Sequence, residues 1–153
     1  MKRGTKMTII LVVAMVMTIA MVVVAYAEYV NDPVWNSGTG RYTQVYEMNV
    51  GYNWTHSIDI PNGSALAKMY AERPALVQCT SNGLTAFPTY YQIRNKTSRE
   101  LLSYEGACTA TGTFLLNYYY PVSPGTNTYL AIRTDPRQST SVINKGNWSP
   151  DNY

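Results

Sequence analysis

Residues 41–54, RYTQVYEMNVGYNW, alternate between two kinds of side chain along their whole length. The even-numbered residues are mostly aromatic or aliphatic, and the odd-numbered ones are mostly small or polar. Successive side chains of a β-strand point to opposite faces, so this pattern predicts a long strand with one buried and one solvated face. Gly51 interrupts the pattern and is expected to mark a bulge or a bend.

The composition after residue 27 favours further strands, because this part holds 13 of the 14 tyrosines together with 14 threonines and 12 asparagines. Tyrosine and threonine favour strands, whereas asparagine, glycine and proline favour turns, of which Asn62-Gly63 is the strongest. The segment 64–72 fits either a short helix capped by Ser64 or a strand, and the surrounding β-pattern favours the strand. Further strands are expected at 75–80, 89–95, 99–106, within 108–121, at 128–134 and at 141–148. Short strands at this spacing predict an all-β fold, a single small antiparallel β-sandwich at 41–153, with a jelly roll as one way of connecting it.

The first 27 residues form a separate segment. Lys2, Arg3 and Lys6 precede a long apolar run that ends in Ala25-Tyr26-Ala27. Signal peptidase requires small residues at positions −3 and −1 before the cleaved bond, and Ala25 and Ala27 fit these positions. We therefore expect an N-terminal signal helix that is cleaved after residue 27. Export to the outside of the cell follows, with 28–40 as a polar leader before the domain. The alternative is an uncleaved anchor, since about 20 apolar residues span a bilayer.

The charge of the chain argues against several classes of partner. The net charge of +3 comes from the three cations of the signal segment, and after residue 27 nine basic residues face nine acidic ones. A neutral protein has no electrostatic attraction for a phosphate backbone. We therefore expect no nucleic-acid partner, and no membrane partner once the signal segment has been removed.

Cys79 and Cys108 are the two cysteines of the chain. In an exported protein such a pair is expected to form a disulfide, and closing a loop of about 29 residues would contribute roughly 3.5 kcal/mol in the chain-entropy model. Two free thiols are the alternative. Two thiols and one histidine without CxxC spacing do not form a zinc site, and the aspartates near the C-terminus lack a calcium-loop pattern. No metal or cofactor is therefore expected.

The sequence contains no convincing set of catalytic residues. His56 is the one histidine, and its neighbour Ser57 would point to the opposite face of a strand. There is no G-x-S-x-G motif, and the carboxylates have no spacing typical of a glycosidase. Glu100 and Glu105, for example, have opposite parity on one expected strand. These observations favour a protein that is not an enzyme.

Aromatic residues are the remaining signal for a binding site. In NYYYP, at 117–121, alternation places Tyr118 and Tyr120 on one face and Tyr119 on the other. Exposed tyrosine and tryptophan offer flat apolar area with a polar edge, which suits sugars and peptides. The alternative is that cross-strand tyrosine pairs cover a small β-protein, and that Trp148 packs into the core. The ligand-binding residues suggested by the sequence are Trp148, Tyr118, Tyr120, Tyr90 and Trp54.

The ending GNWSPD at 146–151 follows the expected strand at 128–134, TYLAIRT. This G-x-W-S-P-D ending resembles that of small exported proteins of Gram-positive bacteria, in which the final strand and its tryptophan close a β-domain. The resemblance implies export and brings no catalytic residue. Together with the composition, it leads us to expect a secreted, non-catalytic β-sandwich that binds a cell-surface or extracellular glycan or protein. Alternatives are a bacteriocin-like antagonistic effector, a hydrolase and a self-assembling surface protein.

Mass spectrometry of the exported protein tests the processing and the disulfide together. The intact mass is expected to equal that of residues 28–153 less two hydrogen atoms, with no thiol available to an alkylating reagent in denaturant. The mass of the whole chain, or two alkylated cysteines, would contradict the expected cleavage or the expected disulfide.

Overall fold

A computed structural model describes residues 28–38, 40–83 and 86–152 of the chain. The expected signal segment, with Ala25 and Ala27, lies outside these residues. Within them the chain is all-β, with one short 3₁₀ turn at Ser57–Asp59. No helix of the described part is long and apolar enough to cross a bilayer.

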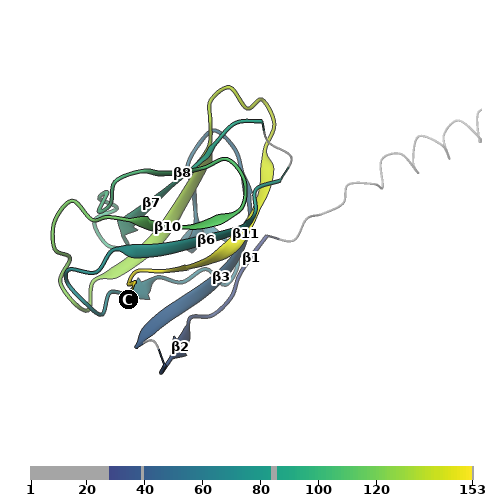
Figure 1. Cartoon of the computed structure of the whole chain (residues 1–153). Helices are drawn as coiled ribbons and strands as arrows, with labels where there is room; N and C mark the ends of the chain where they lie inside the picture. Colours follow the sequence, from purple (N-terminus) through teal and green to yellow (C-terminus); the bar gives the residue numbers. More distant parts are fainter. Residues whose placement is uncertain (1–27, 39, 84–85, 153) are drawn as a thin grey trace, which may run out of the picture.

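Two antiparallel sheets stack on each other, as the sequence predicts (Figure 1). The first sheet has the order β1-β3-β11-β6-β9, with β2 paired to β3 as well. Its strands are β1 (Tyr29–Val30), β2 (Val34–Asn36), β3 (Arg41–Val50), β6 (Ala75–Ser81), β9 (Gly112–Leu116) and β11 (Val142–Ser149). The second sheet has the order β4-β10-β7-β8, with β5 paired to β10. Its strands are β4 (Thr55–His56), β5 (Leu66–Ala67), β7 (Thr89–Asn95), β8 (Gly106–Cys108) and β10 (Asn127–Thr134).

The connections between the main strands are those of a jelly roll. From β3 the chain crosses to the second sheet at β4, returns for β6, crosses again for the hairpin partners β7 and β8, and returns for β9. It then crosses to β10 and finishes at β11, which lies between β3 and β6 (Figure 1). The last strand therefore pairs with the first main strand and lies in the middle of the first sheet.

Strand β3 shows the alternation expected from its sequence. Gln44, Tyr46, Met48 and Val50 are fully buried, whereas Val45 and Asn49 are exposed. The strand ends at Val50 rather than continuing to residue 54, because the chain bends after Gly51 and enters the second sheet at β4. The carbonyl of Gly51 accepts a hydrogen bond from the amide of Thr134 at 2.8 Å, which holds this bend against β10.

Other expected segments differ from the sequence pattern in detail. The leader at 28–40 contributes β1 and β2 to the first sheet, and Val30 is part of the core. The strand expected at 99–106 is mostly irregular, because Arg99 has a positive φ of 62° that breaks the extended backbone. Residues 64–72 contain no helix, and only Leu66 and Ala67 pair as a strand.

A buried ion pair fastens the segment after β5 to the end of the chain. Lys68 Nζ lies 2.7 Å from Asp151 Oδ1, and neither side chain is accessible to solvent. The Lys68 ammonium also donates to the carbonyls of Arg73 and Pro150. The two oxygens of Asp151 accept the amides of Met69 at 2.8 Å and Tyr70 at 3.1 Å. Burial lowers the pKa of Lys68, and the nearby carboxylate opposes that shift.

Removing one partner of this pair is expected to destabilise the fold strongly. Lys68→Met and Asp151→Asn should each lower the free energy of unfolding by about 3–5 kcal/mol, because each leaves the other side chain buried without its partner. The double variant should recover part of the loss, since neither charge is then left unpaired. Urea denaturation followed by circular dichroism measures the effect.

The matched control is Lys145, whose Nζ lies 3.0 Å from Glu47 Oε2 on the partly exposed face of the first sheet. Lys145→Met should cost no more than about 1 kcal/mol, because solvent screens such pairs. Equal losses at Lys68 and Lys145 would show that the buried pair has no special role.

Candidate functional site

Trp148 belongs to the core and is not available to a ligand. Its side chain is 1% exposed, and its Nε1 donates to Gln44 Oε1 at 3.1 Å. It follows Gly146, where the pairing of β11 with β6 shifts register. A Cβ at Gly146 would lie 2.0 Å from the carbonyl oxygen of Gln78, so no larger residue fits there. The alternative prediction, that Trp148 packs into the core, is therefore confirmed.

Trp54 and Tyr90 lie together on the outer face of the second sheet, with an arginine between them. Arg133 pairs with Tyr90 across β10 and β7, and its guanidinium carbon lies 4.3 Å from the Tyr90 ring centroid and 5.1 Å from that of Trp54. Arg133 also donates to both carboxylate oxygens of Glu105. The two rings are thus already engaged by a cation of the same chain, which leaves less of their faces for a ligand.

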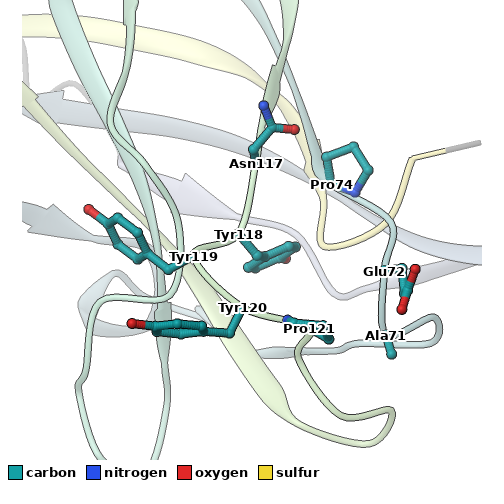
Figure 2. A pocket seen from close by; sticks show the side chains of 8 residues that line it. All are labelled: Ala71, Glu72, Pro74, Asn117, Tyr118, Tyr119, Tyr120 and Pro121. Carbon is teal, nitrogen blue, oxygen red and sulfur yellow. The ribbon is translucent and has the colours of Figure 1, made fainter.

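Tyr118 and Tyr120 line an open pocket of about 260 Å³ at one end of the sandwich. Figure 2 shows the rings of Tyr119 and Tyr120 at one end of this pocket, Glu72 at the other and Tyr118 between them. The lining consists of Ala71, Glu72, Pro74, Asn117, Tyr118, Tyr119, Tyr120 and Pro121. We call it the tyrosine pocket.

The tyrosine pocket forms where two irregular segments meet. One segment follows β9 and carries the three tyrosines, and the other precedes β6 and carries Glu72. The amide of Val122 donates to the carbonyl of Ala71 at 3.1 Å and ties the two walls together. The backbone amide of Tyr119 donates to the carbonyl of Leu102 at 2.9 Å. The backbone amide of Tyr104 donates to the carbonyl of Asn117, also at 2.9 Å. The walls are therefore held by backbone hydrogen bonds and not by side chains alone.

The three consecutive tyrosines have different surroundings. Tyr118 is half-buried, and its hydroxyl donates to the carbonyl of Pro150 at 2.9 Å. Burial raises its pKa, so this hydroxyl remains a donor. Tyr119 packs against Tyr104, with 4.3 Å between ring centroids. Tyr120 is 80% exposed, more than any other large hydrophobic residue of the described part.

Tyr119, Glu72 and Asn117 were missed by the sequence reasoning. Alternation along a strand places Tyr119 on the face opposite to Tyr118 and Tyr120, but β9 ends at Leu116 and the tyrosines lie beyond it. Outside a strand the period of two no longer applies, so all three line one pocket. Pro121 predicted a strand end at this point, but β9 ends five residues before it, and no local signal in the sequence marks Leu116 as its last residue.

A second hollow adjoins the tyrosine pocket. It measures about 220 Å³ and is more apolar, with Leu101, Leu102 and Val122 in its wall. Tyr120 and Pro121 line both hollows and form the ridge between them. The surface can therefore contact a ligand on both sides of one exposed ring.

Cys79 and Cys108 are buried and lie 4.4 Å apart as two thiols, with no disulfide between them. They come from different sheets, and both sulfurs lie within hydrogen-bonding reach of the carbonyl of Ala110. Burial raises the pKa of the Cys79 thiol. A protonated, buried thiol is a poor nucleophile, and the expected disulfide stays a prediction.

A polar network surrounds this cysteine pair in the core. The side-chain amide of Asn144 donates to Tyr91 Oη and to Asn82 Oδ1, each at 2.8 Å. Asn82 in turn donates to the carbonyl of Cys108 at 3.0 Å. The two buried asparagines therefore have a structural role. They link β11 to the segment between β6 and β7.

His56 ends β4 and Ser57 begins the 3₁₀ turn, and their side chains have different partners. His56 Nδ1 lies 3.2 Å from Asp59 Oδ2, and its ring packs against Tyr129. Burial lowers the pKa of His56, against the opposing effect of Asp59. Ser57 Oγ is buried and accepts the amide of Leu130 at 3.2 Å. The three residues do not form a nucleophile–base pair.

No group of three or more histidine, cysteine, aspartate or glutamate side chains in the described ranges is arranged to hold a metal ion. Comparison of the chain with profiles of known families, with characterised proteins and with solved structures gave no significant match.

The packing role of Trp148 can be tested by truncation. Trp148→Ala should lower the free energy of unfolding by about 3–5 kcal/mol, since it leaves a large cavity and an unpaired Gln44 amide oxygen. Trp35→Ala, at a residue that is 45% exposed on β2, should cost clearly less. Urea denaturation measures both, and a Trp148→Ala protein as stable as the parent would contradict the core assignment.

Proposed function

We propose that this protein is a secreted, non-catalytic β-sandwich that binds an extracellular or cell-surface glycan or protein at the tyrosine pocket. The observation that carries the proposal is the run Tyr118–Tyr120, which lines an open hollow with one ring almost fully exposed. Concave sites lined by aromatic side chains are typical of ligand-binding surfaces.

The construction of the tyrosine pocket supports binding by a preformed surface. The hydroxyl of Tyr118 donates a hydrogen bond to the carbonyl of Pro150, which also accepts one from the Lys68 ammonium. The opposite wall is tied through the amide of Asn152, which donates to Pro74 at 2.7 Å. A ligand would meet walls already ordered by the fold, so binding would cost little conformational entropy.

The chemistry of the surface also favours binding over catalysis. Tyrosine rings offer a flat apolar face and a polar edge with few rotatable bonds. Glu47, Asp59 and Glu105 each lie within ion-pair distance of a lysine or arginine side chain. The buried Cys79 thiol and the bonded Ser57 hydroxyl are poorly placed as nucleophiles.

Export and the disulfide are part of the same proposal. The sequence of residues 1–27 supports export, and an oxidising compartment would favour closure of Cys79–Cys108. The two cysteines lie 4.4 Å apart, and a bond between them would join the two sheets.

Binding to surface material tests the proposal. The full chain, expressed with its own N-terminal segment and purified from the medium, is mixed with washed Gram-positive cells or isolated wall polysaccharide, and its depletion is measured. Tyr120→Ala should weaken the binding at least fivefold, about 1 kcal/mol, by removing the exposed ring.

Tyr52→Ala is the matched control, because Tyr52 is 63% exposed and does not line the tyrosine pocket. It should bind like the parent protein. If the parent, Tyr120→Ala and Tyr52→Ala proteins are depleted equally, the binding site lies outside the tyrosine pocket. Killing of the cells by parent and Tyr120→Ala alike, without depletion, would favour the alternative of an antagonistic effector.

A further inference from the structure

We infer that the tyrosine pocket recognises a protonated amine on a glycan, such as the ammonium group of an amino sugar. This inference rests on the proposed function and specifies the class of ligand. It follows from the charge of the lining, the position of the rings and the contacts of the neighbouring cations.

The described lining of the tyrosine pocket carries one ionised side chain, the exposed carboxylate of Glu72. The other polar groups of the wall are the Asn117 amide and the tyrosine hydroxyls, which are neutral. A wall of this composition attracts a cation and repels an anionic polymer. It can also hydrogen-bond the hydroxyl groups of a neutral sugar, though without the attraction of opposite charges.

The two basic residues nearest in sequence to Glu72 are engaged elsewhere. Lys68 is fully buried, donates to three oxygens and is paired with Asp151. The guanidinium carbon of Arg73 lies 3.8 Å from the centroid of the Tyr70 ring, and neither Arg73 nor Tyr70 lines the tyrosine pocket. The positive charge of Arg73 partly offsets the attraction that Glu72 exerts on a cation. The Arg73 side chain does not line the pocket, so it does not fill the site where a ligand ammonium would bind.

The rings of the pocket add to the attraction for a cation. The face of a tyrosine ring is electronegative and attracts an ammonium within about 6 Å of its centroid. Tyr118 already shows this contact on its buried side, where Lys68 Nζ lies 4.5 Å from the ring centroid. Tyr119 and Tyr120 present further rings on the open side of the same wall.

The arrangement in Figure 2 suits a sugar better than an extended side chain. A pyranose ring can pack its apolar face on Tyr119 or Tyr120, while an amino substituent at its edge reaches toward Glu72 at the other end of the pocket. A lysine side chain of a protein would use the ammonium site and leave the flat rings largely uncovered. We therefore assign the pocket to an amine-bearing glycan.

A matched pair of ligands tests the inference. The full chain is titrated with the glucosamine tetrasaccharide and with the N-acetylglucosamine tetrasaccharide, which differ in the charge and acetylation of the amine. Isothermal calorimetry should show the charged tetrasaccharide binding about tenfold more tightly at low salt, with the advantage shrinking as salt is added. Poly-lysine is titrated as the protein-like cation and should bind more weakly than the charged tetrasaccharide, because its side chains leave the flat rings uncovered.

Three variants distinguish the contribution of the Glu72 charge to binding from that of the tyrosine rings. Glu72→Gln should reduce the advantage of the charged tetrasaccharide to the part that the rings supply, while keeping the binding of the acetylated one. Asp32→Asn removes one exposed carboxylate elsewhere on the surface and should leave the advantage unchanged. Tyr120→Ala should weaken both ligands.

Each contrary outcome has a distinct meaning. Equal binding of the two tetrasaccharides, lost in Tyr120→Ala, would overturn the amine inference and leave the proposed function intact. Poly-lysine that competes for the pocket at equal affinity would overturn the assignment to a glycan. Absence of binding by either tetrasaccharide would overturn the inference, and the depletion of the protein by whole cells would then decide the proposed function separately.

Discussion

The ion pair between Lys68 and Asp151 is the contact on which the rest of this structure depends. It buries two opposite charges completely and satisfies them with backbone groups from two segments of the chain, residues 69–73 and Pro150. Charges removed from water at such cost require this degree of hydrogen bonding. Because Asp151 follows directly on β11, the pair holds the last strand between β3 and β6. In a jelly roll that strand closes the first sheet, so the buried pair and the packing of Trp148 stabilise the same step of assembly.

The same contact also supports the tyrosine pocket. Pro150, next to Asp151, accepts hydrogen bonds from Lys68 and from Tyr118, and Asn152 donates to Pro74 in the opposite wall. Pro150 and Asn152 thus contact the two segments that build the pocket, residues 117–121 and 71–74, without lining the pocket themselves.

Three sets of aromatic residues differ in what contacts their rings. Tyr46, Tyr91 and Trp148 fill the core. Trp54 and Tyr90 stack with Arg133 on the outer face of the second sheet. At the tyrosine pocket and the hollow that adjoins it, a largely exposed ring, that of Tyr120, lines a concave surface. This distribution makes the pocket the best-supported ligand site within the described part of the chain.

The amino-acid sequence alone determined the fold class, because alternation in β3 and the turn residues between short strands are local properties that need no knowledge of distant contacts. It also identified the tyrosine run as a candidate site. It did not determine that β3 ends at Val50, that residues 29–36 join the first sheet, or that Trp148 is buried while Tyr120 is exposed. Tertiary structure decided these points, since the burial of a side chain depends on partners far along the chain. Trp148 meets Gln44 from 104 residues away, and Tyr118 meets Pro150 from 32 residues away. No local pattern encodes such distances, and so the position and chemistry of the pocket emerge only when the two sheets are packed.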